Sequence, residues 1–224
     1  MRRTFKFSFS FSLLLCSLLL TAQEADTVKA RSAISLGMDI TGPVLYALDN
    51  SRFSYEGHLS YRLNYKYYIV CEPGYSEYNY DQYNYEYNSK GWFVRIGADI
   101  GMLAPVASKI NHFAGIGLRY GLSVFEQETP FIIIDSYWGR INTSIPRNTV
   151  HAHFLEVQGS VKTELVRNLL IGWSVKLRTL IYSSGRNEEK AVYIPGIGGT
   201  DASFVPAFSY YIIYRIPIGS SSVE

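Results

Sequence analysis

The chain has 224 residues, with 21 Lys and Arg against 19 Asp and Glu, and 47% of its residues are hydrophobic. This near-neutral charge excludes a basic nucleic-acid-binding protein, and the length suits a single domain. The 19 tyrosines and 12 phenylalanines favour β-strands.

Residues 1–22 predict a secretory signal peptide. Arg2, Arg3 and Lys6 form a positive start, the apolar run "FSFSLLLCSLLL" follows, and "TAQ" offers a cleavage site after Ala22. A transmembrane anchor is the alternative, but it needs a longer apolar core. The expected mature domain is therefore 23–224, exported from the cytoplasm.

Cleavage would remove three of the 21 basic residues, leaving 18 against 19 acidic ones and a net charge of −1. No nucleic-acid partner is expected of such a chain. Cys71 would be the one remaining cysteine, which excludes an intrachain disulfide.

Apolar and polar residues alternate in eight segments of the mature chain, and no segment shows a sustained helical period. This pattern predicts eight antiparallel strands, near residues 32–41, 53–62, 67–80, 83–102, 112–125, 151–165, 169–182 and 204–218. Short connections follow the second, fourth and sixth strands, whereas 126–150 and 183–203 are long. Short periplasmic turns and longer extracellular loops are typical of an eight-stranded transmembrane β-barrel with a periplasmic N-terminus.

Each predicted strand has one apolar and one polar face, and either could face inward. The lumen of an eight-stranded barrel is just wide enough for side chains to fill, so the many large apolar residues fit better outside. Glycines such as Gly97 and Gly117 on the polar face leave room for long charged side chains. We therefore expect the polar face inside and the apolar face against lipid. The alternative is a secreted lipocalin-like barrel whose apolar face encloses a ligand.

The predicted lumen contains seven basic and six acidic residues. They are Arg62, Arg95, Arg119, Lys162, Lys176, Arg178 and Arg215, with Asp39, Glu56, Glu72, Asp99, Glu156 and Glu164. Unpaired buried charges are costly, so these residues are expected to form a network that plugs the barrel. A small pore is the alternative, but an ion-selective one would need an excess of one charge.

The stretch "YNYDQYNYEYNS" (78–89) is dense in tyrosine. With Asp81-Gln82 as a two-residue turn, Tyr80 would pair with Tyr83 and Tyr78 with Tyr85. The opposite face is polar, so the hairpin is expected to stand above the membrane.

These four tyrosines would form a platform for a sugar or an envelope protein, or act only as strand-forming residues. A β-bulge at Pro73-Gly74 would change the faces involved.

Two groups of residues suggest chemistry. Glu56, His58 and Ser60 alternate along one strand face, but ~6.8 Å between alternate positions exceeds hydrogen-bond reach. His151 and His153 would supply two metal ligands without a third. No catalytic residue, metal or cofactor is therefore predicted. A lipid-modifying barrel enzyme that uses these histidines is the rival hypothesis.

The apolar stretch "FIIIDSYWG" (131–139) either prolongs the fifth strand or docks a partner. Both possibilities are consistent with the sequence.

The segments "GIGLRYG", "HAHFLEVQGSVKTEL", "LLIGWSVKLRTLI", "YIPGIGG" and "YYIIYRIPI" resemble a Bacteroidota family of outer-membrane β-barrel proteins classed as a domain of unknown function. The resemblance implies the barrel fold and an outer-membrane location, and it carries no functional residues. Typical outer-membrane barrels end on an aromatic residue, whereas here 219–224 follow Ile218.

The sequence thus predicts an integral outer-membrane protein of a Gram-negative bacterium, non-enzymatic and acting through its extracellular loops. Its expected partners are membrane lipid, the barrel insertion machinery, and an envelope protein or glycan.

Overall fold

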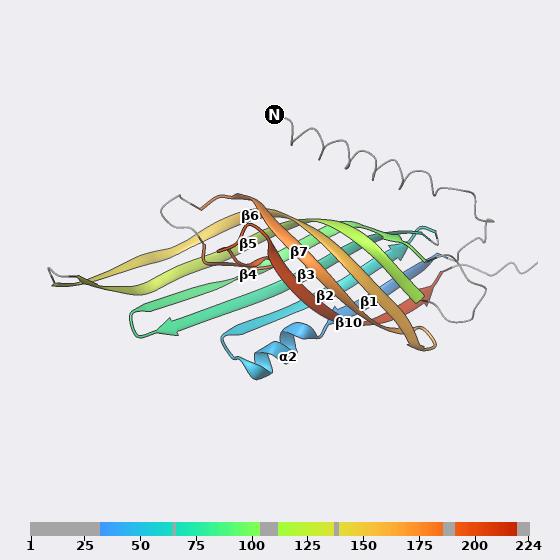
Figure 1. Ribbon diagram of the computed structural model, residues 1–224, viewed down its shortest axis with the longest axis horizontal. Helices are drawn as coiled ribbons and strands as arrows, with labels where there is room; N and C mark the ends of the chain where they lie inside the picture. Colours follow the sequence, from blue (N-terminus) through green and yellow to red (C-terminus); the bar gives the residue numbers. More distant parts are fainter. Residues whose placement is uncertain (1–31, 65, 104–111, 137–138, 186–190, 219–224) are drawn as a thin grey trace, which may run out of the picture.

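The computed structural model describes residues 32–64, 66–103, 112–136, 139–185 and 191–218 (Figure 1). The predicted signal peptide and its cleavage site lie outside these residues, as do 219–224.

Eight antiparallel strands close into a barrel in the order β1-β10-β7-β6-β5-β4-β3-β2. Their bounds are β1 Ala33–Asp39, β2 Arg52–Arg62, β3 Tyr67–Gln82, β4 Tyr85–Gly101, β5 His112–Ser136, β6 Gly139–Val166, β7 Leu169–Ser183 and β10 Val205–Pro217. The predicted eight-stranded antiparallel barrel is confirmed. Both ends of the described chain meet at the end with the short turns, where Ile218 N donates to Ser32 O at 2.8 Å.

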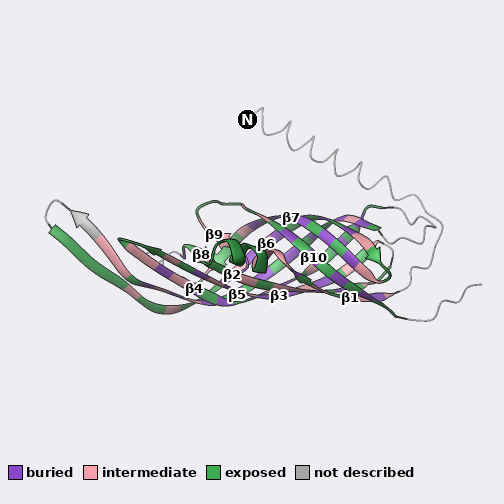
Figure 2. Cartoon of the chain, turned by 90° about the horizontal axis from the view of Figure 1, so that it is seen from below, coloured by how far each residue is buried: buried purple, intermediate pink, exposed green. Residues whose placement is uncertain are grey.

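Side chains alternate between the two faces of the barrel wall, as the purple and green bands of Figure 2 show. The outward positions carry exposed apolar residues, which we call the apolar belt. It includes Leu36, Met38, Tyr55, Leu59, Ile69, Trp92, Ile96, Ile100, Leu118, Val157, Ile171, Val175, Leu177, Ile212, Tyr214 and Ile216. The lipocalin-like alternative is wrong, because the apolar face points out of the barrel. In the part of the chain described, no helix has the length and apolar character to cross a membrane.

Strands β5 and β6 are far longer than predicted. They form a twisted ribbon that leaves the barrel at the end opposite the short turns (Figure 1). They stay paired out to Ser136 and Gly139. Residues 126–150, predicted to be a loop, are therefore mostly β-ribbon. Of the stretch 131–139, residues 131–136 prolong the fifth strand, and 137–138 lie outside the described residues.

A short helix, α2 (Thr41–Leu48), connects β1 to β2, although no helix was predicted. The predicted first strand ends early, at Asp39, whose carboxylate accepts a hydrogen bond from Thr41 N at 2.8 Å. Pro43 lies in the first turn, where its missing N–H costs no helical hydrogen bond. Eight residues are too few for a helical period to stand out in the sequence.

Residues 191–200 fold back into the mouth of the barrel, and we call them the inward loop. Two-residue strands β8 (Tyr193–Ile194) and β9 (Gly198–Gly199) form its hairpin. Ile194 and Ile197 are buried in one cluster with Phe125, Val150 and Phe154 of the wall. The long connection predicted over 183–203 thus includes an apolar plug, which burial of these side chains stabilises.

The glycines on the lumenal face fit closely against large side chains. A Cβ at Gly121 would lie 2.1 Å from Cζ of Phe154, whereas a Cβ at Gly159, which faces outward, would meet nothing within 4 Å. We expect Gly121→Ala to lower the free energy of unfolding by about 1–3 kcal/mol because of overpacking. Gly159→Ala is the matched control and should leave it unchanged. Urea unfolding in detergent measures both, and equal midpoints would contradict this packing.

Candidate functional site

Arg95, on β4, is the centre of the charged lumen. Its Nη1 donates to Glu156 Oε2 at 2.8 Å, its Nη2 pairs with Glu56, and its Nε lies 3.3 Å from Glu72 Oε2. The three carboxylates come from β6, β2 and β3, so one guanidinium ties together four strands. Arg178 adds a bond from Nε to Glu156 Oε2 at 2.7 Å.

A second group of charges is centred on Asp99. Arg119 Nη2 donates to Asp99 Oδ1 at 2.5 Å, and Lys162 Nζ lies 3.7 Å from Oδ2. His58 joins the two groups, because its Nδ1 contacts Glu72 Oε1 at 3.0 Å and its Nε2 lies 3.3 Å from Lys162 Nζ.

We call these two groups the lumenal network. It comprises Glu56, His58, Glu72, Arg95, Asp99, Arg119, Glu156, Lys162, Lys176 and Arg178, with Lys176 Nζ 3.4 Å from Glu56 Oε2.

The other predicted lumenal charges lie nearer the ends of their strands. Asp39 accepts the Thr41 N–H, and Arg62 lies over the Tyr68 ring with 5.6 Å between Cζ and the ring centroid. Glu164 accepts a hydrogen bond from Asn168 N at 2.8 Å. Arg215 lines a cavity of ≈ 10 Å³ beside Lys162, which is about the size of one water molecule.

The alternating Glu56, His58 and Ser60, which only the rival enzyme hypothesis would use, do not form a triad in the lumen. His58 contacts Glu72 of β3 instead of Glu56, and only 3% of its surface is exposed. A lipid substrate has no access to such an imidazole. His58 therefore bridges an acid and a base as part of the packing.

His151 and His153 lie outside the barrel. Their neighbours Ala152 and Phe154 are buried inward, so the histidines point outward. His153 Nδ1 is 2.7 Å from Tyr120 OH, and its ring packs against Tyr182. Among the residues described, no three His, Cys, Asp or Glu side chains are grouped as a metal site would require.

The predicted hairpin register of the tyrosines is wrong. The turn is Tyr83-Asn84, so Tyr80 pairs with Tyr87, Gln82 with Tyr85, and Tyr78 with Ser89. Tyr83 is 81% exposed at the turn, away from the others. The bulge expected at Pro73-Gly74 is also absent, because β3 keeps one register with β4 along its length.

Tyr78, Tyr80, Tyr85 and Tyr87 share the lumenal side of the β3–β4 hairpin, and we call them the tyrosine face. Successive ring centroids lie 6.0–6.4 Å apart. The sequence prediction missed Tyr87, which takes the place given to Tyr83.

The two tyrosines of this face that lie nearer the barrel, Tyr78 and Tyr87, contact the inward loop. Tyr78 stacks on Tyr193 with ring centroids 4.7 Å apart, and Tyr87 OH donates to Gln127 Oε1 at 3.0 Å and contacts Tyr193 O. Tyr78 and Tyr87 are only 8% and 3% exposed, so they are structural. Tyr80 and Tyr85, one step further from the barrel, are half-buried.

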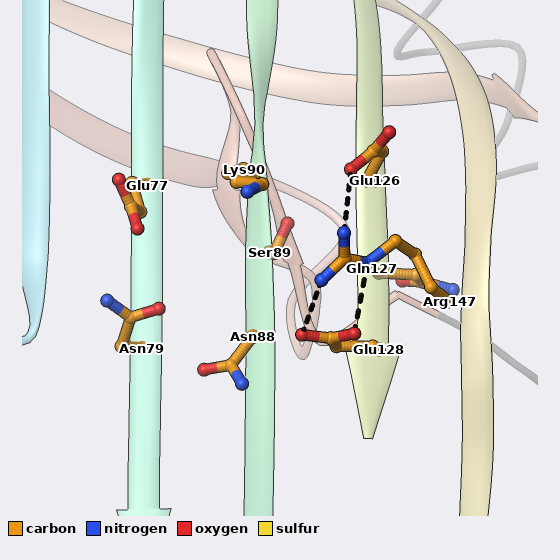
Figure 3. Close-up of a pocket in the computed structure, with 9 residues that line it drawn as sticks. All are labelled: Glu77, Asn79, Asn88, Ser89, Lys90, Glu126, Gln127, Glu128 and Arg147. Atoms are coloured by element: carbon orange, nitrogen blue, oxygen red, sulfur yellow. Dashed lines mark hydrogen bonds and ion pairs between the residues drawn. The ribbon is translucent and has the colours of Figure 1, made fainter. Parts of the chain in front are cut away.

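A shallow polar cavity of ≈ 180 Å³ lies between β3, β4, β5 and β6 where they leave the barrel (Figure 3). It is lined by Glu77, Asn79, Asn88, Ser89, Lys90, Glu126, Gln127, Glu128 and Arg147. Arg147 donates from Nε and Nη2 to Glu128 at 3.0 and 3.2 Å. These bonds lower the pKa of Glu128 below its usual value, so the pair is charged at neutral pH. The lining is polar, and none of these lining residues is a nucleophile held by a base.

The fold and these sites define a closed, charge-filled β-barrel that carries an extended β-ribbon. Residues 3–220 match the DUF6048 family, and the chain belongs to this family, which is described as a domain of unknown function. No curated protein matches the chain in sequence.

Solved outer-membrane proteins have distant similarity to the chain. The attachment invasion locus protein Ail of Yersinia pestis is 11% identical, with 84% of this chain and 100% of that chain covered and a TM-score of 0.39. A major outer membrane protein from Thermus thermophilus is 11% identical, with 83% and 98% covered and a TM-score of 0.44. Neisserial surface protein A is 10% identical, with 84% and 95% covered and a TM-score of 0.37. At TM-scores below 0.5, these similarities decide neither the fold nor the function.

The lumenal network makes a sharp prediction for stability. Arg95→Met would leave Glu56, Glu72 and Glu156 without their shared cation, and we expect a loss of about 3–5 kcal/mol in the free energy of unfolding. Arg95→Met/Glu72→Gln should recover part of it, because Glu72 is the acid of the three that pairs with neither Lys176 nor Arg178, and its charge would be removed. Arg147→Met is the control, since its pairs are solvated and should not shift the urea midpoint. A wild-type midpoint for Arg95→Met would contradict the role of the network.

Proposed function

We propose that the protein is an integral outer-membrane β-barrel of a Gram-negative bacterium, and that it works without catalysis through the strands that extend outside the cell. The resemblance of the sequence makes a Bacteroidota outer membrane the expected one. The observation that carries the proposal is the exposed apolar belt around a packed, charged lumen.

The belt has sharp edges of the kind a bilayer requires. Going outward along β4, exposed Trp92 is followed by exposed Lys90, and on β5 exposed Val124 is followed by Glu126. Towards the short turns, the outward-facing residues of β4 stay apolar as far as Met102, the residue directly after the strand. Ten residue steps at ~3.3 Å on a strand tilted by about 40° rise roughly 25 Å, which matches the apolar band of outer-membrane barrels.

The closed lumen favours an anchoring role over transport. Arg95, Glu72 and Glu156 have 0% exposed surface and lie where a pore would run, and the inward loop covers the mouth above them. The enzyme alternative is not favoured by the histidines, since His58 is sealed in. His153 contacts Tyr120 and Tyr182 in place of an acid, and the described residues hold no metal-ligand group around it.

The working surface that we propose is the outer part of the hairpins. Tyr80 and Tyr85 present partly exposed rings, and Tyr83 stands at the turn. Arg140 Nη2 donates to Tyr83 OH at 3.1 Å, so the β5–β6 ribbon lies beside this turn. Rigid rings with hydroxyl groups suit contact with a glycan or an envelope protein.

Insertion without conductance is the first test. The protein should fractionate with the outer membrane, require detergent for extraction, and migrate faster on gels before boiling than after. In planar bilayers it should show no stable conductance, because the lumenal network blocks the path. Folded protein recovered from the periplasm without detergent would overturn the location, and a reproducible ohmic step would favour a pore.

The tyrosine surface is tested by capture of envelope proteins and glycans on the purified barrel. Tyr80→Ser/Tyr83→Ser/Tyr85→Ser should fold and insert but lose binding, at ~0.5–1.5 kcal/mol for each aromatic contact. The matched set of three Tyr→Phe changes should keep most of it. Capture should also be compared with a chain shortened within 126–150. Unchanged capture by the serine variant would show that the tyrosines are strand-forming residues only.

A further inference from the structure

Helix α2 is exposed and has no charged residue. Its sequence, TGPVLYAL, is mostly apolar, and none of its residues is buried. Val44 and Leu45 are half exposed, and Leu48 is 81% exposed. An apolar surface of this kind in water is unfavourable, so something apolar should cover it.

Strand β1, which precedes α2, is too short to cross the apolar belt. Its seven residues, Ala33–Asp39, rise only about 15 Å over six steps at ~3.3 Å per residue and a tilt of about 40°. The neighbouring strands β2 and β10 have 11 and 13 residues, which are enough to cross the belt. The wall is therefore short of a strand at its upper edge between β10 and β2.

Helix α2 lies at this gap, on the outside of the barrel (Figure 1). Ile40 N donates to Tyr210 O at 2.9 Å, and Tyr210 N donates to Thr41 Oγ1 at 2.7 Å, so the helix start caps the free edge of β10. A Cβ at Gly42 would lie 2.0 Å from Ser54 O, which shows how closely the helix approaches β2. The ring of Tyr46 packs edge-on against that of Phe53, with 5.2 Å between the ring centroids.

The depth of α2 matches the upper part of the apolar belt. Tyr55, next to Phe53 on the outer face of β2, packs against Tyr75 and Trp92 at the edge of the belt. The helix ends at Leu48, and the carboxylate of Asp49 after it accepts a hydrogen bond from Ser51 N at 3.0 Å, so a polar turn follows the helix. The apolar side chains of α2 thus lie beside the upper edge of the belt, linked to it through Tyr46, Phe53 and Tyr55.

We propose that α2 lies in the outer leaflet, with Val44, Leu45 and Leu48 against acyl chains, and that it replaces the missing upper part of β1. An open strand edge does not face lipid, because its N–H and C=O groups would have no partners there. The helix satisfies its own backbone and covers this edge. This inference rests on the proposed membrane location.

Spin labels test the depth of α2 in phosphatidylcholine vesicles. A label at Leu45→Cys, in the full chain with Cys16→Ala and Cys71→Ala, is compared with two reference positions. Leu118→Cys lies in the belt on β5, and Tyr83→Cys lies at the turn above it. Collisions with oxygen report lipid, and collisions with a water-soluble nickel chelate report water.

The label at Leu45 should collide with oxygen as the Leu118 label does, and its nickel collisions should be several-fold fewer than those of the Tyr83 label. A water-like Leu45 label with a lipid-like Leu118 label would overturn the inference about α2 alone. Low collision with both reagents would also overturn it, because protein would then cover the helix. A water-like Leu118 label would overturn the membrane location itself. Leu45→Ala, with unchanged gel migration and insertion, shows whether the position tolerates substitution.

Discussion

The structure depends on one constraint: a narrow lumen holds charged side chains that must all find partners inside it. Arg95 meets this constraint by pairing with carboxylates from three other strands, so the wall is tied across its interior as well as along its hydrogen-bonded edges. Glycines opposite these side chains supply the space. The apolar belt follows from the same arrangement, since a lumen full of charges leaves the large apolar residues no place but the outside.

The lumenal network also contacts the loop that fills the mouth of the barrel. Arg178 bonds to Glu156 and donates from Nη1 to Ile197 O at 3.2 Å, so the network reaches the inward loop directly. Above it, Ile194 and Ile197 form an apolar layer, and Tyr78 and Tyr87 clamp the loop from the side. The tyrosine-rich hairpin thus has two parts: a lower part that completes the plug, and an upper part that is open to a partner.

The sequence was sufficient for the number of barrel strands and for their faces, because a period of two persists along each of them, but not for the lengths of β1, β5 and β6. It was not sufficient for register. Moving the turn from Asp81-Gln82 to Tyr83-Asn84 shifts the pairing by an even number of residues, so the face of Tyr78 and Tyr80 stays the same while every partner changes. The inward loop was missed because Ile194 and Ile197 stand among glycines and a proline that indicate an irregular loop. The pairing of Arg95 with three acids depends on the closed barrel, which no local pattern contains.

The β5–β6 ribbon has a mechanical consequence. Within the described residues, β4 pairs with β5 only as far as Tyr85 and Ile132, and Ile133 N donates to Asn84 O at 2.8 Å just past this point. Beyond it, β5 and β6 form a backbone ladder only with each other. Register shifts near Gln127 and Thr129 interrupt the regular pairing at the base, which makes this the place where the ribbon bends most easily. A pull along the ribbon, in contrast, loads the hydrogen bonds of β5 and β6 with the barrel in shear, so that many must break together. The ribbon is therefore compliant to sideways load and stiff to tension.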